Sequence, residues 1–510
     1  MHTLLEIDEI LAMIARYLRV DKDEQRDLLS FVLTCRNFFI PGLDVLWESI
    51  RDIDPLMCLF PDNMVNSLEI MPATTRSWMD RPVKLHEFKT IPTAAQLQRV
   101  LFYTRHVRNF HFTNAIYQPC LAELMEGAFG IILFPILQNL IWDSDALPNS
   151  EFFQFILSPS LTSICISIKS VYQLAIFLSD AHSLTPHLKA IELRHGTLDI
   201  HTAVITRIAK SLSVLKQLTV INLNFPHAGL PIIDHKTLAQ ISRFPKLKSI
   251  ACTLSSAHIS PSMVHLVDAF PSLEDLKFQW DDQNCTAVVL HILHAISSQS
   301  LRTVALHPPA NIDPDDICPL INLVAMHPFL IELSIIYRHH LTIVDQGVGN
   351  SFRQMSLPVS YLEPLLKLLL LNRLQFDGIV IPFTGSFISS MANAWPTLTI
   401  LIFDPLEPFN GTVVDILELI HFAQCSPNLE ALHIPFSSPY KSSDQIPPRI
   451  IRADSAPTVE IYTLSSRIVK PSTTAAILYA MFGYFLSDNI DLEGAMKVVG
   501  NNLDDNDDLS

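Results

Sequence analysis

Residues 271–278 read Pro-Ser-Leu-Glu-Asp-Leu-Lys-Phe, and the same pattern returns along most of the chain. A leucine is followed three residues later by a second apolar residue and five residues later by a third, often with a proline just before. Side chains alternate between the two faces of a strand, so the second and third apolar residues point the same way. The pattern therefore predicts a series of short strands, each with one buried face.

The pattern occurs twelve times at a nearly constant period. The matches begin at Val107, Leu137, Leu161, Leu188, Leu218, Leu247, Leu273, Leu301, Leu330, Leu371, Leu398 and Leu429. The eleven intervals average about 29 residues, at the upper end of leucine-rich-repeat lengths. The chain thus resembles a leucine-rich-repeat protein. That resemblance implies an α/β fold, a right-handed solenoid with a parallel sheet on its concave face and helices on its convex face.

Segments between the matches carry apolar residues at helical spacing, as the convex side requires. They cover 171–178, 204–212, 263–270, 288–296, 317–326 and 413–422, and a further helix is expected at 93–103. The repeat family places Asn or Cys eight residues after the first position, whereas this chain has residues such as Ala115 and Gly196 there. The repeats therefore resemble the divergent kind found in the expanded F-box family of mushroom-forming fungi.

The first fifty residues predict three short helices. Apolar residues from Leu4 to Leu18 recur at alternating steps of three and four, which defines one helix face. Asp27 is a plausible N-cap for a second helix, and Pro41 suits the first turn of a third. Three helices in fifty residues bury little area, so such a unit usually packs against another surface.

This run resembles an F-box. The matching residues are Leu4-Leu5-Glu6-Ile7, Ile10-Leu11, Tyr17-Leu18, Asp27-Leu28, Val32, Cys35-Arg36-Asn37-Phe38 and Leu46-Trp47-Glu48, and Leu5 stands where the family has proline. The resemblance implies docking on the Skp-type linker subunit of a cullin–RING ubiquitin ligase. The implied docking residues are Leu4, Leu5, Ile7, Ile10, Leu11, Leu18, Leu28, Val32, Cys35, Phe38, Leu46 and Trp47.

Composition excludes several classes of function. The formal net charge of −16 argues against nucleic-acid binding, which needs clustered Lys and Arg. None of the eight cysteines is spaced Cys-x-x-Cys, which is typical of buried thiols in a reducing compartment. The longest uncharged run, 378–403, is broken by prolines and polar residues and is a poor membrane span. We expect a soluble protein of the cytoplasm, the nucleus or both.

Motifs of catalysis are missing from the sequence. It contains no Gly-x-Ser-x-Gly, no phosphate-binding glycine loop and no His-Glu-x-x-His. His291 and His294 are too few for a metal site, and His339-His340 fits a solvated turn. The acids around Pro314 resemble a helix N-terminus. We therefore expect a non-catalytic protein without a cofactor or metal.

Binding is the better prospect, because the residues between the inward apolar positions of each strand point to the concave surface. The charged or ionisable candidates for holding a protein substrate are His111, Asp143, Glu192, Arg194, Asp275, Lys277, Glu332, Arg373, Asp377 and Asp404. Leaving His111 aside, they comprise six acids and three bases, which favours a basic or polar peptide surface as partner. A sheet face that is merely exposed to water and binds no partner would carry much the same set of charged residues.

The predicted organisation is an F-box at 1–50, a linker at 51–89 and a solenoid at 90–436. A loop at 437–458, a terminal strand and capping helix at 459–490 and an acidic, disordered tail at 491–510 complete it. The implied function is that of a substrate-recognition adaptor in a Skp–cullin–F-box ligase, with no nucleic acid or membrane as partner. The alternative is a repeat scaffold that binds proteins outside any ligase.

Overall fold

A computed structural model describes most of the 510 residues. The described ranges are 7–19, 25–70, 83–113, 118–127, 130–143, 155–167, 171–194, 210–223, 233–255, 266–280, 282–309, 312–337, 355–405, 414–437, 458–461, 471–482 and 485–487. The chain divides into two compact units, Met1–Leu247 (Unit 1) and Lys248–Ser510 (Unit 2). Each unit is built from parallel strands with helices between them, so the fold is α/β with a large parallel sheet.

Unit 1 begins with three helices, α1 (Asp8–Tyr17), α2 (Gln25–Thr34) and α3 (Arg36–Trp47). Ala15, Leu28 and Val45, one from each helix, form their shared core. The helices α2 and α3 begin earlier than the sequence indicated, and α3 begins at Arg36 because Cys35 adopts an extended backbone. Asp27 consequently lies in the first turn of α2 and is not its N-cap, and Pro41 lies inside α3.

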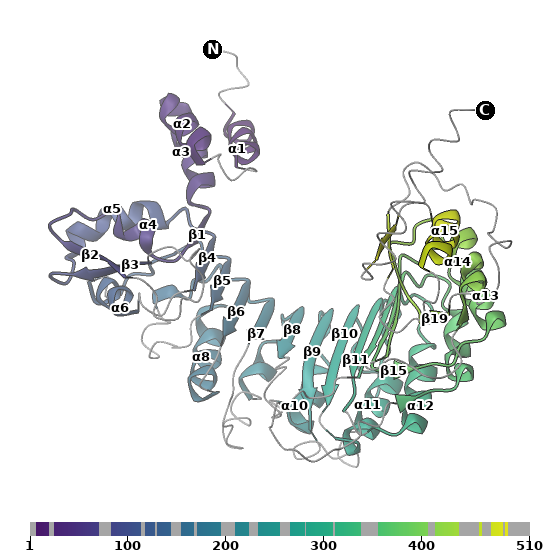
Figure 1. The fold of residues 1–510 in the computed structure, drawn as a ribbon. Helices are drawn as coiled ribbons and strands as arrows, with labels where there is room; N and C mark the ends of the chain where they lie inside the picture. The colour runs from purple at the N-terminus through teal and green to yellow at the C-terminus, as the bar shows by residue number, and fades with distance from the viewer. Residues whose placement is uncertain are drawn as a thin grey trace, which may run out of the picture. The chain divides into compact units, whose positions relative to one another are not determined.

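The parallel sheet of Unit 1 starts directly after α3 (Figure 1). Its strands, in spatial order, are β1 (Ser49–Arg51), β4 (Asn109–Phe112), β5 (Asn139–Trp142), β6 (Ser163–Ser167), β7 (Ala190–Arg194) and β8 (Val220–Leu223). Its helices include α5 (Ala94–Thr104), α6 (Gln118–Gly127), α8 (Val171–Leu184) and α10 (His235–Ile241). The first strand thus begins within residues 1–50, where only helices were expected.

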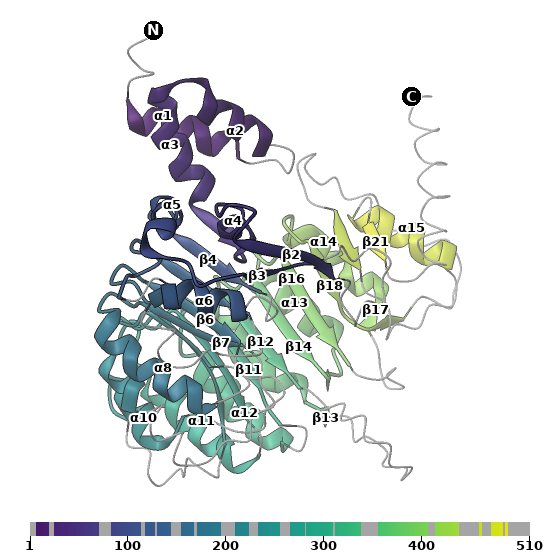
Figure 2. The ribbon, with the colours of Figure 1, turned by 90° about the vertical axis from the view of Figure 1, so that its left-hand side faces the viewer.

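The stretch expected to be a linker contains regular structure. It holds α4 (Asp54–Met57) and an antiparallel pair, β2 (Val65–Ile70) and β3 (Val83–Phe88), which Figure 2 shows as a separate ribbon. His86 ties the pair to α4, because its imidazole bonds Asp54 at 3.0 Å and Ser67 at 2.9 Å. The described part of 51–89 is therefore an ordered excursion between β1 and β4.

Unit 2 continues the same construction. In spatial order they are β9 (Ser249–Leu254), β10 (Asp275–Trp280), β11 (Thr303–His307), β12 (Glu332–Ile336), β14 (Arg373–Asp377), β16 (Ile400–Asp404), β18 (Ala431–His433), β20 (Val459–Ile461) and β21 (Phe485–Ser487). Two small parallel pairs join β13 (Met355–Ser356) to β15 (Ile379–Val380) and β17 (Val414–Asp415) to β19 (Phe436–Ser437).

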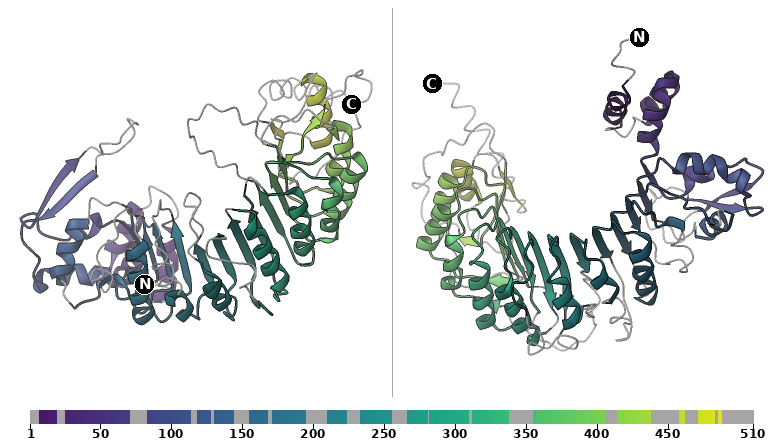
Figure 3. Two further views of the ribbon diagram at one scale, coloured as in Figure 1. Left: turned by 90° about the horizontal axis from the view of Figure 1, so that it is seen from below. Right: turned by 180° about the vertical axis from the view of Figure 1, so that it is seen from behind.

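Helices cover one face of the Unit 2 strands, as the green segments in Figure 3 show. They are α11 (Asn284–Ala295), α12 (Pro314–Val324), η4 (Val359–Lys367), α13 (Gly385–Ala394), η5 (Ile416–Leu419), α14 (Ile420–Cys425) and α15 (Pro471–Phe482). The helices α8, α11 and α12 occupy the predicted segments 171–178, 288–296 and 317–326, and α5 occupies 93–103. Most of 204–212 lies outside the described residues.

Three predicted helices differ. Within 263–270 the described residues 266–270 form no helix, because Asp268 and Phe270 have φ of 48° and 53° and Ala269 bridges Ile296. The segment 413–422 is divided among β17, η5 and α14. Within 459–490, where a strand and a capping helix were expected, the helix α15 lies between the strands β20 and β21, which pair with each other.

Each of the twelve matches of the sequence pattern leads into a strand of the parallel sheet, which confirms the predicted series of short strands. The first residue of every match is at most 1% exposed. Registers align equivalent positions, so Leu276 of β10 faces Val304 of β11 and Phe278 faces Leu306. Stacked apolar residues from successive repeats thus form a continuous core within each unit.

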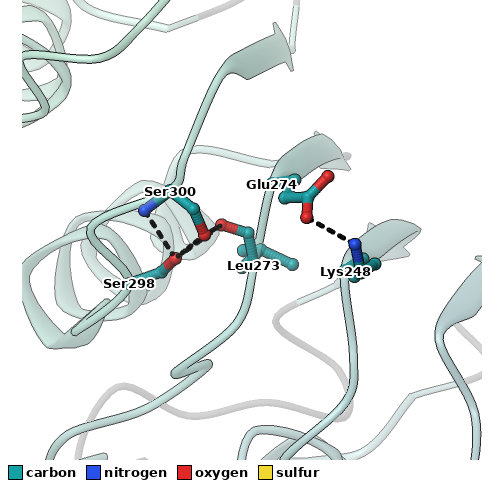
Figure 4. Close-up of polar contacts among 5 residues, drawn as sticks. All are labelled: Lys248, Leu273, Glu274, Ser298 and Ser300. Atoms are coloured by element: carbon teal, nitrogen blue, oxygen red, sulfur yellow. Dashed lines mark hydrogen bonds and ion pairs between the residues drawn. The ribbon is translucent and has the colours of Figure 1, made fainter.

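Two repeats have a buried serine at the turn into the strand. In Figure 4 the buried Ser298 hydroxyl donates to the carbonyl oxygen of Leu273 in the preceding repeat, at 2.6 Å. It also accepts from the backbone N–H of Ser300, at 3.1 Å. In Unit 1, Ser158 makes the equivalent bonds to Pro135 (2.6 Å) and Ser160 (3.2 Å). A buried hydroxyl three residues before the leucine therefore fixes the turn into the strand.

Candidate functional site

The three N-terminal helices expose an unusual amount of apolar surface. Met13 and Tyr17 on α1 are 62% and 80% exposed, and Leu29 and Leu33 on α2 are 46% and 71% exposed. Both pairs are four residues apart, so each pair lies along one side of its helix. Six of the sixteen large apolar side chains that the described residues expose lie within residues 7–40. Such a concentration is typical of an interaction surface.

The residues implied to dock a linker subunit lie at different depths. Leu11, Leu28 and Val32 are at most 3% exposed, whereas Ile7 is 41% exposed. Ile10, Leu18, Cys35, Phe38, Leu46 and Trp47 are half-buried. Leu4 and Leu5 lie outside the described residues. The buried three shape the helices, so a partner that docks on this unit as it stands would contact the exposed and half-buried residues.

Met13, Tyr17, Leu29 and Leu33 were not among the predicted docking residues. In the sequence, the apolar stripe of each helix is wider than the face that its neighbours cover. The packing of α3 determines which edge of each apolar stripe stays exposed. The local sequence of α1 or α2 does not predict that edge. The i, i+4 spacing of apolar residues beside the core positions was the available signal.

The helical unit is joined firmly to the sheet. The carbonyl oxygen of Glu48, between α3 and β1, accepts from the N–H groups of Arg108 (2.9 Å) and Asn109 (2.8 Å). The side chain of Glu48 forms an ion pair with Arg19 at 2.8 Å. Trp47 packs on Tyr103 of α5, with ring centroids 4.8 Å apart. A partner held by the helices is therefore held next to the first strands of Unit 1.

The polar face of Unit 2 is formed by the side chains between the inward core positions, and we call it the Unit 2 ladder face. Register places Glu332 directly beside Arg373, and Asp377 beside Asp404. Asp275 and Lys277 lie two residues apart on β10 and share this face. All six predicted residues of this unit thus lie on one surface, with acids and bases interspersed.

Hydrogen bonds order part of the Unit 2 ladder face. Gln375, which the sequence analysis did not single out, accepts from Arg373 at 3.2 Å and donates to Asp377 at 2.8 Å along β14. Asp404 lies 3.7 Å from the imidazole of His433 on the next strand. The side chains are therefore oriented by one another, as in a pre-organised binding surface.

The four predicted residues of Unit 1 do not form one cluster. Glu192 and Arg194 pair with each other at 2.9 Å, and this hydrogen bond holds the pKa of Arg194 above its ordinary value. Asp143 accepts from Ser167 at 2.7 Å. His111 lies on β4, and its Nε2 is buried without a hydrogen-bond partner. Two of the four residues are thus committed to each other.

Two of the groups considered for catalysis or metal binding have structural roles. His291 accepts from the backbone N–H of Leu266 at 3.3 Å. Asp313 caps α12 and accepts from the N–H of Asp315 at 3.0 Å, which confirms the helix N-terminus. His339 and His340 lie outside the described residues. Among described residues, no group of three His, Cys, Asp or Glu is placed to hold a metal ion.

Burial also lowers the reactivity of several cysteine thiols. It raises the pKa of Cys120 and of Cys165 to about 12, so both remain protonated at neutral pH. Burial raises the pKa of Cys252 as well. Within the part of the chain that the structure describes, no helix is long and apolar enough to cross a bilayer.

Comparisons with known proteins assign no family. No protein-family model matches the sequence, and no curated protein matches it. Among solved structures, one similar chain comes from the "Crystal structure of Rad7 and Elc1 complex in yeast". It is 11% identical, with a TM-score of 0.33, and the similarity covers 68% of this chain and 77% of that one. A similarity at this level assigns neither a family nor a function.

Proposed function

We propose that the protein is a substrate-recognition adaptor of a cullin–RING ubiquitin ligase. The three N-terminal helices act as an F-box and dock a Skp-type linker subunit, and the strand faces behind them hold a protein target. The protein performs no bond chemistry itself. It accelerates ubiquitin transfer by holding the target near a partner enzyme, which raises the effective concentration of the reacting groups.

The exposed apolar side chains of α1 and α2 are the observation that carries this proposal. Burying Met13 and Leu33 against a partner favours binding by up to about 1.5–3 kcal/mol each, before the entropic cost of association is subtracted. The F-box resemblance of residues 4–48 names a partner that such a surface fits. The repeat fold supports the second half of the proposal, because solenoids offer extended protein-binding surfaces.

Titration calorimetry of the purified chain with a purified Skp-type linker subunit tests the proposal. We expect binding by the natural chain and at least a tenfold loss for Met13→Glu and for Leu33→Glu, because each places a charge in the apolar contact. Val267→Glu is the matched control, since Val267 is 82% exposed in Unit 2. An unchanged circular dichroism spectrum establishes that each variant folds. Heat of binding that is equal in all four proteins would refute the assignment.

The alternative is a repeat scaffold that acts outside any ligase. One observation favours it: α3 continues into β1, so the helical unit also covers the end of the Unit 1 sheet. An open solenoid end needs such a cap. The same titration separates the two functions, because a scaffold of this kind gives no heat with the linker subunit.

A further inference from the structure

A cleft of about 940 Å³ lies where the helical unit meets the first strands of Unit 1. Its floor is formed by the outward side chains of β1, β4 and β5, and its walls include Arg19, Leu46 and Trp47. The volume is near the upper end of the range for small-molecule pockets, and it fits several residues of an extended peptide. Trp47 and Leu46, implied by the F-box resemblance to dock the linker, thus also line a cleft of their own.

The floor of the cleft is an ordered polar ladder. Asn139 donates to Asn109 at 2.6 Å, and Asn109 donates to Ser49 at 2.8 Å, so successive strands present a fixed row of amide groups. Two residues further along β1 and β4, Arg51 lies in register with His111. Because the row is held by its own hydrogen bonds, a peptide that lies across it loses little entropy to side-chain ordering.

The charge of the cleft is opposite to that of the chain. Its lining residues include Arg19 and Arg51 but no Asp or Glu, although the chain has 51 acids against 35 Lys and Arg, and of the two arginines only Arg19 is paired, with Glu48. Arg51 is exposed and makes no ion pair with any described residue. The neighbouring Asp52 carboxylate is occupied, because it accepts from the N–H and hydroxyl of Thr113, both at 2.7 Å. A carboxylate brought into the cleft therefore meets uncompensated positive charge.

His111 adds a second, independent sign of a ligand. Its Nε2 is buried and has no hydrogen-bond partner, although the residue lines the cleft. A buried polar atom without a partner costs free energy, and a ligand group would recover that cost once the His111 ring turns its Nε2 toward the cleft. Leu46, Trp47 and Ile141 supply apolar surface beside these polar groups. The cleft thus suits a carboxylate next to a large apolar side chain.

We propose that this cleft binds a short acidic segment of the protein target, with an aspartate or glutamate at Arg51 and His111 and an apolar residue against Trp47. The proposal rests on the proposed function in one respect, because it takes the ligand to be part of a target. The ligand is a peptide, because a phosphate or a nucleic-acid backbone has no apolar side chain to pack against Leu46 and Trp47.

Fluorescence anisotropy of the full chain with a labelled peptide, Glu-Asp-Leu-Phe-Glu-Asp, tests the proposal. We expect saturable binding that weakens about tenfold or more in Arg51→Glu, because a rim cation becomes a repelling anion. His111→Leu should weaken binding, and His111→Gln should retain more of it because an amide can still bond to the ligand. Arg243→Glu, an equally exposed arginine elsewhere in Unit 1, should leave binding unchanged.

Three results would overturn the proposal: no binding of the acidic peptide, equal binding of Lys-Lys-Leu-Phe-Lys-Lys, or equal binding by Arg51→Glu and the natural chain. Tighter binding of a single-stranded oligonucleotide would overturn it too. The linker subunit is absent from this assay, so its outcome is independent of F-box docking. If the linker binds and the peptide does not, the cleft proposal fails and the proposed function stands.

Discussion

Replacement of Ser298 by alanine tests how the repeats are held in register. The Ser298 side chain is 2% exposed, and its hydroxyl uses its one hydrogen to bond Leu273 and its lone pairs to accept from Ser300. Ser298→Ala leaves a buried carbonyl oxygen and an N–H group without that partner. Such a loss costs about 1–3 kcal/mol of unfolding free energy. For a unit of this size, each kcal/mol lowers Tm by roughly 2–4 °C.

Urea denaturation followed by tryptophan fluorescence measures the change, because Trp280 and Trp395 are buried in the same unit. Ser300→Ala is the matched control. Its hydroxyl lies 3.5 Å from the Leu273 oxygen, too long for a strong bond, and its closer partner is the Ser298 hydroxyl at 3.0 Å, so the expected loss is smaller, about 0.5–1 kcal/mol. Equal losses in the two variants, or a Ser298→Ala variant as stable as the natural chain, would show that the buried hydroxyl does not fix the turn.

Three further predictions concern the two units. Gly378→Ala should destabilise Unit 2 by about 1–3 kcal/mol, because Gly378 has φ of +77° and an added Cβ would lie 2.6 Å from the carbonyl oxygen of Tyr337; thermal denaturation measures this. Asp234→Ala should cost Unit 1 about 1 kcal/mol, since Asp234 is the N-cap of α10, and Asp234→Asn should recover most of it in the same assay. Iodoacetamide should alkylate the exposed Cys58 first and leave Cys165 unmodified at pH 7–8, because burial raises the pKa of Cys165 to about 12. Mass spectrometry of the folded chain over that pH range measures this, and equal alkylation rates of the two cysteines would contradict it.

The repeats were predictable because their signal is local and is repeated. Each strand carries its buried residues at fixed spacing, so twelve weak matches reinforce one another. The hairpin of β2 and β3 carried no such signal. Of the described β2 side chains only Val65 is half-buried, and Asn66, Ser67 and Leu68 are exposed. The true first strand, β1, was missed because three residues are too short for the pattern.

The candidate sites were predictable only where register determines them. His111 was found because every repeat places a side chain of the same position on the polar face. Asn109 and Asn139 occupy equivalent positions in two repeats, and their hydrogen bond follows from that equivalence. Arg19 lines the cleft because the N-terminal helices pack against strands that lie far from Arg19 in the sequence. No spacing in the sequence encodes that approach.

Light scattering after size-exclusion chromatography of the chain mixed with a Skp-type linker subunit tests the central claim most directly. The chain alone has a mass of 57.4 kDa. The adaptor account predicts a single peak whose mass is the sum of one chain and one linker subunit. A peak at 57.4 kDa, with the linker subunit eluting separately at the same loading, would contradict it.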